Sequence, residues 1–237
     1  MTSARSTAAT AASAATSPAP RVYRGANNEQ RSAERRARLL AAAIHCFGTH
    51  GYHQTTLKML CAEAGLTERY FYESYANFDD ILCCAYEHAA GAITAQIIAN
   101  VAKAAPDPSA RLHAALDCYL GQIAADPARA RLLLIEIEGA SERANATYRT
   151  RLDIATDLIE FEVCRGLPAR PVNGLSPRLL CSAMLGAIYQ MAKNWTLAGF
   201  KPARATLHRN LHAAAMAIIA AWQAPAAAAA STPTRKT

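Results

Sequence analysis

The side chains best suited to chemistry in this chain are seven cysteines and two histidines one helical turn apart. The cysteines lie in apolar stretches without Cys-x-x-Cys spacing, which is typical of reduced, buried residues. They are Cys46, Cys61, Cys83, Cys84, Cys118, Cys164 and Cys181. The adjacent Cys83 and Cys84 leave a redox-sensing role open. His208 and His212 could bind a metal, but no carboxylate or cysteine lies at matching spacing on the same helix, so we expect no metal site.

Catalytic motifs are missing from the sequence. It contains no GxSxG, no HExxH, no GxxxxGK and no recognisable pair of nucleophile and base. We therefore expect no enzymatic activity, no catalytic residue and no cofactor. An enzyme that uses a cysteine thiol or a histidine is the less favoured alternative.

The elements that position any site should be helices. Hydrophobic residues make up 52% and charged residues 18% of the 237 residues, which is enough apolar surface for a packed globule. Much of the apolar fraction is alanine, the best helix former, while β-branched and aromatic residues are sparse. The composition predicts an all-α protein.

The chain offers little to suggest export or a membrane. Residues 1–20 lack the Leu/Val/Ile-rich run of a secretory signal, so we expect a cytoplasmic protein. Residues 210–234 carry no charge, but His212, Gln223 and Pro225 interrupt them. A helix of a soluble protein followed by a tail is the better interpretation, with no membrane partner.

Helix signals follow one another along most of the chain. Residues 1–28 are Ala/Ser/Thr-rich and predict a disordered arm, and residues 223–237 predict a disordered tail. Between them, Gly51 ends a first helix, Thr55 or Thr56 caps a short second one, Thr67 caps a third and Asn77 caps a long fourth. Further helical patterns cover 112–125, 127–139, 141–163, 176–198 and 203–222.

The second and third helices, joined at Ala64-Gly65-Leu66, have the geometry that places a helix in the DNA major groove. Residues 51–82 read GYHQTTLKMLCAEAGLTERYFYESYANFDDIL. With the preceding RRARLLAAAIHCFG, the segment from about 31 to 85 closely resembles the DNA-binding segment of TetR-family regulators. Its paired threonines, its glycine turn and its Tyr three residues before a second aromatic carry the resemblance.

The resemblance implies an all-α fold in two parts. Residues 29–76 would form an N-terminal three-helix helix-turn-helix DNA-binding domain, and residues 77–222 a C-terminal helical bundle that binds an effector and dimerises. The residues that would contact DNA backbone or bases are Thr56, Lys58, Thr67, Glu68, Arg69, Tyr70 and Tyr72. Arg69 is the best candidate for reading a base, because a guanidinium can bond O6 and N7 of guanine together.

Basic residues concentrate before the resemblance begins. Residues 29–82 hold six basic and seven acidic side chains, so the DNA-binding segment itself is not basic. Arg21, Arg24 and Arg36, with Arg31, Arg35 and Arg38 nearby, place positive charge on the arm and first helix. We expect these arginines to contact phosphates.

The function that the resemblance implies is that of a ligand-responsive repressor binding a near-palindromic double-stranded operator as a homodimer. The dimer would form through helices 176–198 and 203–222, whose apolar stripe Leu211, Ala215, Ile218, Ile219 and Trp222 needs a partner. A small apolar effector could be lined by Tyr119, Phe161, Tyr189 and Trp195.

The main alternative is a helical adaptor that lacks DNA binding. It gains weight from Phe78, which stands where the family usually has a lysine. We expect Phe78 to pack against the third helix instead.

Overall fold

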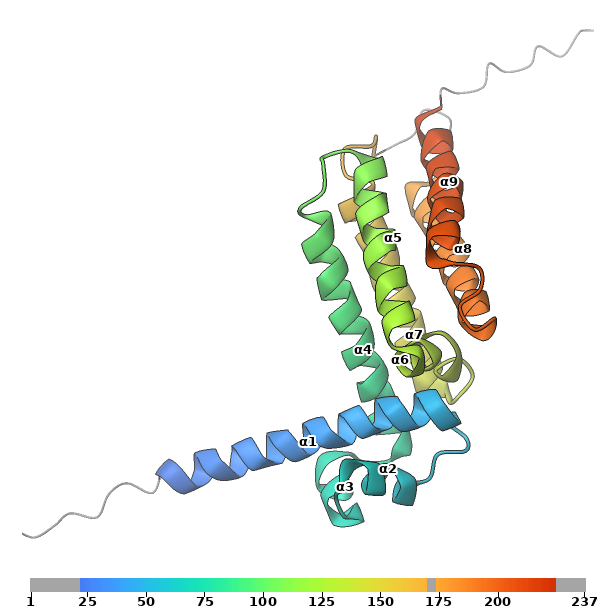
Figure 1. Cartoon of the computed structure of the whole chain (residues 1–237). Helices are drawn as coiled ribbons and strands as arrows, with labels where there is room; N and C mark the ends of the chain where they lie inside the picture. The colour runs from blue at the N-terminus through green and yellow to red at the C-terminus, as the bar shows by residue number, and fades with distance from the viewer. Residues whose placement is uncertain (1–21, 170–173, 225–237) are drawn as a thin grey trace, which may run out of the picture.

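The computed structural model describes residues 22–169 and 174–224, with side chains from residue 28 onward. All regular structure in these ranges is helical, which confirms the all-α prediction (Figure 1). The elements are α1 (Val22–His50), α2 (Leu57–Ala64), α3 (Glu68–Ser74), α4 (Phe78–Val101), α5 (Pro108–Ala125), α6 (Pro127–Arg131), η1 (Leu132–Glu136), α7 (Glu142–Leu158), η2 (Ile159–Val163), α8 (Pro177–Leu197) and α9 (Arg204–Gln223).

The first helix is longer than the sequence suggested. It begins at Val22 rather than near residue 28, two residues after Pro20, and runs to His50. Proline is excluded from a helix interior but tolerated just before it, so Pro20 is a better start signal than the end of the Ala/Ser/Thr-rich run. The rest of the predicted arm, residues 1–21, and the predicted tail from residue 225 lie outside the described residues.

Helix α1 runs across the base of an upright bundle formed by α4, α5, α7, α8 and α9 (Figure 1). It packs against α2, α3 and α4, and against α6 beneath the bundle. Helices α1, α2 and α3 are called the small domain below. At the crossing with α6, a Cβ built on Gly48 would lie 2.0 Å from the backbone oxygen of Ala128. Only glycine therefore allows the two helices to approach this closely.

Local capping explains where the bundle helices begin. The side chains of Asp107, Ser141 and Ser176 each accept a hydrogen bond from the backbone N–H three residues further on. Pro108, Pro127 and Pro177 occupy first helical positions, where the missing N–H costs nothing.

Two stretches predicted as plain helices contain π-helical segments. Helix α6 passes into η1, and α7 passes into η2. A π-helical turn holds an extra residue and changes which side chains face inward. Leu132 and Leu134 are fully buried as a result, while Phe161 in η2 is turned outward.

The apolar stripe on α9 is buried within the chain itself, whereas the sequence analysis expected it to pack against a second subunit. Leu211, Ala215, Ile219 and Trp222 are all buried, because α9 packs against α5 and α8. The Trp222 indole also donates to the backbone oxygen of Pro168, at 2.8 Å. The periodic pattern identified a packed face correctly, but it could not tell a partner in the same chain from a second subunit.

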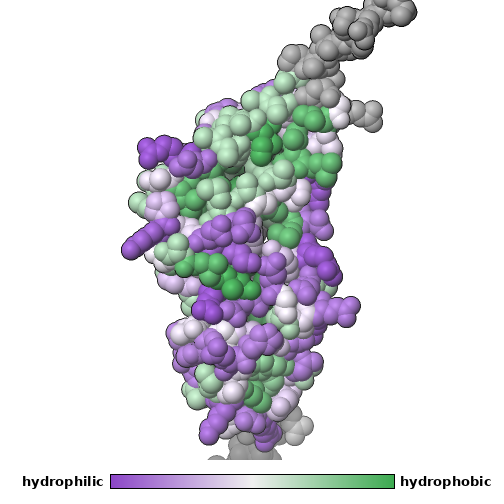
Figure 2. Space-filling view, turned by 90° about the vertical axis from the view of Figure 1, so that its right-hand side faces the viewer, coloured by the Kyte–Doolittle hydropathy of each residue, from purple (hydrophilic) through white to green (hydrophobic). Residues whose placement is uncertain are grey.

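The outward face of α8 and α9 carries small residues instead. Its exposed members include Ala183, Gly186, Ala213, Ala217 and Ala220. Figure 2, which looks onto this side of the molecule, shows hydrophobic residues gathered in its upper half. This surface is smooth enough for helices of another molecule to approach closely.

Helix α4 connects the small domain to the bundle. Among the described helices it alone is long and apolar enough, by length and composition, to cross a membrane. It packs along α1, α5 and α7 and fully buries Ile81, Leu82 and Ala85. Packing against these three helices accounts for many of the apolar residues of α4.

Candidate functional site

The turn between α2 and α3 is built by a few local interactions. Thr56 caps α2 by accepting a hydrogen bond from the N–H of Met59, at 3.2 Å. Gly65 ends the helix in the left-handed region, with φ of 59°, and Leu66 N–H bonds the oxygen of Cys61 at 2.9 Å. Glycine adopts this conformation without steric cost, so the position of α3 is set by the sequence of the turn itself.

The inner face of α3 anchors it to the rest of the domain. Phe71 and Tyr75, which lie on the same face of α3 at i,i+4 spacing, are almost fully buried. The Tyr75 hydroxyl donates to the backbone oxygen of Arg36, and burial raises the pKa of that phenol to about 12. The phenol therefore stays neutral at physiological pH and acts as a hydrogen-bond donor.

Three arginines of α1 hold the small domain together, rather than all pointing to solvent. Arg36 donates to the backbone oxygen of Ser74 at 2.8 Å. Arg38 donates to the backbone oxygens of Ala64 and Gly65, at 2.6 and 3.2 Å. Arg35 lies over the ring of Tyr70, with 4.6 Å between the guanidinium carbon and the ring centroid.

These contacts change the prediction for the basic cluster. The guanidinium of Arg36 is hydrogen-bonded to the C-terminal end of α3 and positions that helix. Arg24 lies in the first turn of α1, in the part whose side chains are not described, and Arg21 lies outside the described residues. The structure therefore does not place the predicted phosphate contacts of these two arginines.

The outer face of α2 and α3 presents most of the remaining predicted residues together. Thr56, Lys58, Thr67, Glu68 and Arg69 are exposed, and Tyr72 is 62% exposed. Thr67 occupies the N-cap position of α3, but its side chain makes no cap hydrogen bond, contrary to expectation. Its hydroxyl is available to an outside partner.

Charge on this face is mixed. The Arg69 guanidinium is 2.9 Å from a carboxylate oxygen of Glu73, with 83% of its side chain exposed. An exposed ion pair of this kind contributes little to stability, so Arg69 can readily exchange Glu73 for another partner. Tyr70 is half-buried beneath Arg35, so less of its ring is presented than the sequence suggested.

Phe78 packs in an aromatic cluster, as predicted for its contact with α3. Its ring centroid is 5.3 Å from that of Phe47, 5.8 Å from that of Tyr52 and 6.5 Å from that of Phe71. Such edge-on and tilted pairs add stability beyond burial alone. The cluster fixes the start of α4 against the small domain.

Two acidic residues join the small domain to the bundle, and the sequence analysis missed both. Glu136 in η1 accepts from the backbone N–H of Tyr52 at 2.8 Å and from Arg131 at 2.7 Å. Asp80 in α4 accepts from Ala76 N–H and from Arg143 of α7. The Ala76 hydrogen bond first, and then Arg143, hold the pKa of Asp80 below its ordinary value. The partners that join the two parts, Tyr52 and Arg143, lie far away in the chain, so no local signal could have revealed these contacts.

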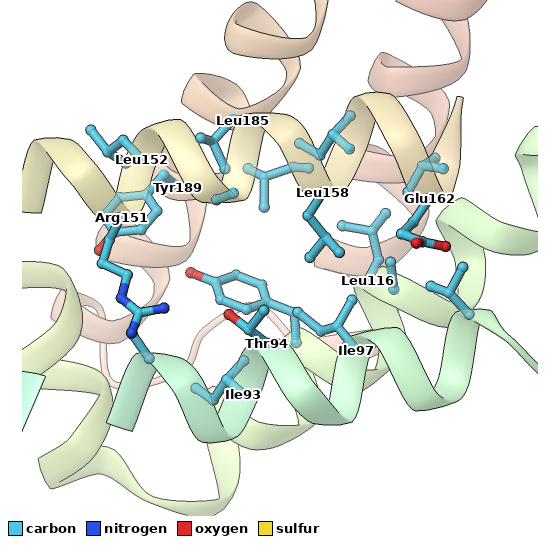
Figure 3. Close-up of a pocket in the computed structure, with 18 of the residues that line it drawn as sticks. Ile93, Thr94, Ile97, Leu116, Arg151, Leu152, Leu158, Glu162, Leu185 and Tyr189 are labelled. Atoms are coloured by element: carbon cyan, nitrogen blue, oxygen red, sulfur yellow. The ribbon is translucent and has the colours of Figure 1, made fainter. Parts of the chain in front are cut away.

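A cavity of about 140 Å³, partly open to solvent, lies in the bundle between α4, α5, α7, η2 and α8. Ile93, Thr94 and Ile97 of α4 face Leu158 of α7 across it, and Arg151 and Glu162 lie toward its two ends (Figure 3). Most other lining residues are aliphatic or alanine. The middle of the cavity is therefore suited to an apolar molecule.

Two of the four aromatic residues predicted for the effector site line the cavity. Tyr119 and Tyr189 do so, whereas Phe161 is 65% exposed and Trp195 packs elsewhere. Phe161 faces outward because it sits in the π-helical turn of η2. The Trp195 indole stacks edge-on against Phe200 and donates to the oxygen of Pro202, which closes the turn between α8 and α9.

The histidines and the adjacent cysteines take structural positions. His208 and His212 bond backbone oxygens of α5, at 3.2 Å from His113 and Ser109 respectively. In the described part of the chain, no group of three or more His, Cys, Asp or Glu is arranged to hold a metal ion. Burial raises the pKa of the Cys84 thiol, which favours the less reactive protonated form.

Comparison with known proteins agrees with this geometry. The family model for bacterial regulatory proteins of the tetR family matches residues 39–82. No curated protein sequence matches the chain. Solved structures share its fold at low sequence identity. The fatty acid degradation regulator FadR from Bacillus halodurans has 19% identity and a TM-score of 0.66, covering 77% of this chain and 94% of that chain.

Two further structures extend the likeness. FadR from Bacillus subtilis, solved in complex with stearoyl-CoA, has 19% identity and a TM-score of 0.61, with 75% of this chain and 95% of that chain covered. A TetR-family transcriptional regulator from Streptomyces coelicolor has 15% identity and a TM-score of 0.62, with 81% and 97% covered. Nearly the full length of each of these proteins is matched.

Residues 39–82 therefore carry the DNA-binding segment typical of bacterial regulatory proteins of the tetR family. The described helices of the chain adopt the fold of TetR-family transcriptional regulators. The predicted fold class is confirmed, and the predicted resemblance to the tetR family is borne out over residues 39–82.

Proposed function

We propose that this protein is a cytoplasmic, ligand-responsive repressor that binds a near-palindromic operator as a homodimer. The observation that carries the proposal is the exposure of Thr67, Glu68, Arg69 and Tyr72 on α3, while Phe71 and Tyr75 hold the helix from behind. A short helix that is rigidly seated and polar on its outer face is suited to the major groove. Nothing in this role requires an enzymatic step or a cofactor.

Within this proposal the contacts divide by kind. Arg69 reads a base edge, with Thr67, Glu68 and Tyr70 beside it. Thr56, Lys58 and Tyr72 contact phosphates, together with Arg21 and Arg24 of the arm. Arg36 acts indirectly, since its hydrogen bond to Ser74 positions the end of α3.

The homodimer forms through the outward faces of α8 and α9. Their exposed alanines and glycine allow two copies to pack four helices closely, with little side-chain entropy lost. A two-fold dimer would place its recognition helices about 34–36 Å apart, or a multiple of that distance, so each reads one half-site.

The effector binds in the cavity between α4, α5, α7 and α8 and opposes DNA binding. Helix α4 lines the cavity with Ile93 and Ile97, and its first turn contacts the small domain through Phe78 and Asp80. A ligand that favours one position of α4 therefore changes the separation of the recognition helices. The stearoyl-CoA complex of Bacillus subtilis FadR supports ligand binding on this fold.

Selection of bound fragments from a random DNA pool by the full-length protein tests the proposal. We expect an inverted repeat whose half-sites are separated by about one or two helical turns. Affinity for the repeat should fall steeply with salt concentration, because phosphate contacts release counterions. A helical adaptor without DNA binding would recover no consensus and show no such salt dependence.

A further inference from the structure

The size of the cavity limits what it can hold. Its volume of about 140 Å³ is close to that of an engineered cavity of about 150 Å³ that binds benzene. Pockets for drug-sized ligands have volumes of about 300–1,000 Å³. A single small ring fills a space of this volume.

One polar atom in the cavity wall has no partner. The Tyr119 hydroxyl is buried and, among the described residues, is the single buried side-chain polar atom without a hydrogen bond. By contrast, Tyr189, which also lines the cavity, donates to the backbone oxygen of Leu133. Burial raises the pKa of Tyr119, so its hydroxyl is neutral and can donate and accept. A buried polar group without a partner is costly, which favours a ligand that supplies one.

The charged groups at the two ends of the cavity are already paired. Arg151 binds Glu87 through the Nε, at 2.7 Å, and through a second guanidinium nitrogen. Glu162 accepts from Arg165 at 2.8 Å. An anionic or cationic ligand would therefore enter an apolar space with no free counter-charge, which is unfavourable.

We propose that the cavity binds a small, neutral ring compound of about phenol size, whose single oxygen hydrogen-bonds to the Tyr119 hydroxyl. This inference rests on the proposed role of the cavity as the effector site, and it names the class of effector. The ring lies among the aliphatic side chains that line the cavity, including Ile93, Ile97 and Leu158 (Figure 3).

Titration calorimetry on the full-length protein tests the proposal with phenol, toluene, benzoate and stearoyl-CoA as probes. Phenol and toluene have nearly the same shape and differ in the hydrogen-bonding oxygen. We expect the ratio of phenol to toluene affinity to fall about fivefold to tenfold in Tyr119→Phe, the loss expected for one buried hydrogen bond. Comparing ratios cancels the different hydration of the two probes.

Tyr148→Phe is the matched control, because Tyr148 lies beside this cavity without lining it. That variant should keep the wild-type ratio. Tyr119→Phe should have an unchanged or raised thermal midpoint without ligand, since it removes an unsatisfied buried group. Ala155→Leu fills the cavity and should abolish binding of both rings. This variant tests the proposal if Tyr119→Phe fails to fold.

Four results would overturn the inference: no binding of either ring, an unchanged ratio in Tyr119→Phe, a lowered thermal midpoint in that variant, or tighter binding of benzoate or stearoyl-CoA than of phenol. Operator binding is measured separately, without ligand. A protein that binds phenol as expected but does not bind an operator in the absence of ligand would refute the proposed function and leave the ligand class intact.

Discussion

Arg69 carries the most specific expectation for a single residue. In the free protein its guanidinium pairs with Glu73, and on DNA it exchanges this weak exposed pair for a guanine edge. Arg69→Ala should weaken operator binding by about 1–3 kcal/mol and relax the preference at one base pair of each half-site. Fluorescence anisotropy on operators varied at each position measures both effects.

Arg165→Ala is the control, because Arg165 lies at the opposite end of the bundle and pairs with Glu162. It should leave operator affinity unchanged. A loss in Arg69→Ala that is equal for every DNA sequence would assign Arg69 to a phosphate rather than to a base.

Asp80 gives the protein a defined acid sensitivity. Its folded-state pKa is lowered, chiefly by the Ala76 N–H and then by Arg143, so the ionised form stabilises the fold. This contribution is complete above the unfolded pKa of about 3.9 and is lost as pH falls through the lower folded value. Asp80→Asn should unfold more easily at pH 7, by about 1 kcal/mol, and lose less stability than the wild type below pH 4.

Thermal unfolding followed by circular dichroism between pH 2.5 and 7 measures the difference. Asp117→Asn is the control and should follow the wild-type curve, because Asp117 on α5 makes only an exposed ion pair with Arg204, at 3.3 Å. Parallel pH profiles for wild type and Asp80→Asn would show that the junction does not depend on this carboxylate.

Local residue patterns predicted the DNA-binding elements well, because their geometry is set by neighbours in sequence. Thr56, Gly65 and Phe71 have the roles that their types and spacing indicated. The roles of Arg36 and Glu136 could not be predicted, because their partners, Ser74 and Tyr52, come from other elements. A charged side chain near a binding segment can serve packing as easily as DNA.

At the scale of elements, α1 and α6 cross closely at Gly48. Gly48→Ala would bring a Cβ to 2.0 Å from the oxygen of Ala128, and a backbone atom cannot yield as a side chain can. The helices must separate, so we expect a loss of about 1–3 kcal/mol in the free energy of unfolding. Urea denaturation measures it.

Gly91→Ala is the matched control within a helix. Its Cβ would make an ordinary contact, 3.7 Å from the Arg151 guanidinium. Because alanine is the better helix former, this variant should gain stability, by about 0.5–1 kcal/mol. Equal destabilisation of the two variants would mean that the α1–α6 crossing has no special steric demand.

Helix positions were predictable from capping and periodicity, but the orientation of single side chains was not. Ser141 and Ser176 mark helix starts as expected, because a cap acts within one turn. The π-helical turn in η2 then shifts the phase, so Phe161 points to solvent while Tyr119 on the regular α5 lines the cavity. An interruption of this kind leaves no clear pattern in the residues.

At the scale of the whole molecule, the structure points to another dimer surface than the sequence did. The stripe ending at Trp222 is buried within the chain, which leaves the alanine face of α8 and α9 for a second copy. Ala217→Arg places a long charged side chain on that face. It should convert the protein to monomers and weaken operator binding strongly, because two half-sites then bind independently.

Analytical ultracentrifugation measures the mass of each variant. Ala99→Glu, on the exposed side of α4, is the control and should keep the wild-type mass. A dimer that persists in Ala217→Arg would place the interface elsewhere on the molecule.

The central claim is that a dimer of this chain reads DNA with α3, and the stoichiometry on a selected inverted repeat tests it most directly. Sedimentation of the complex, with the intact repeat and with a single half-site at equal length, gives both mass and affinity. The account predicts two protomers on the intact repeat and a large loss of affinity on the half-site. Equal affinity for the two duplexes, or no binding to either at low salt, would contradict it.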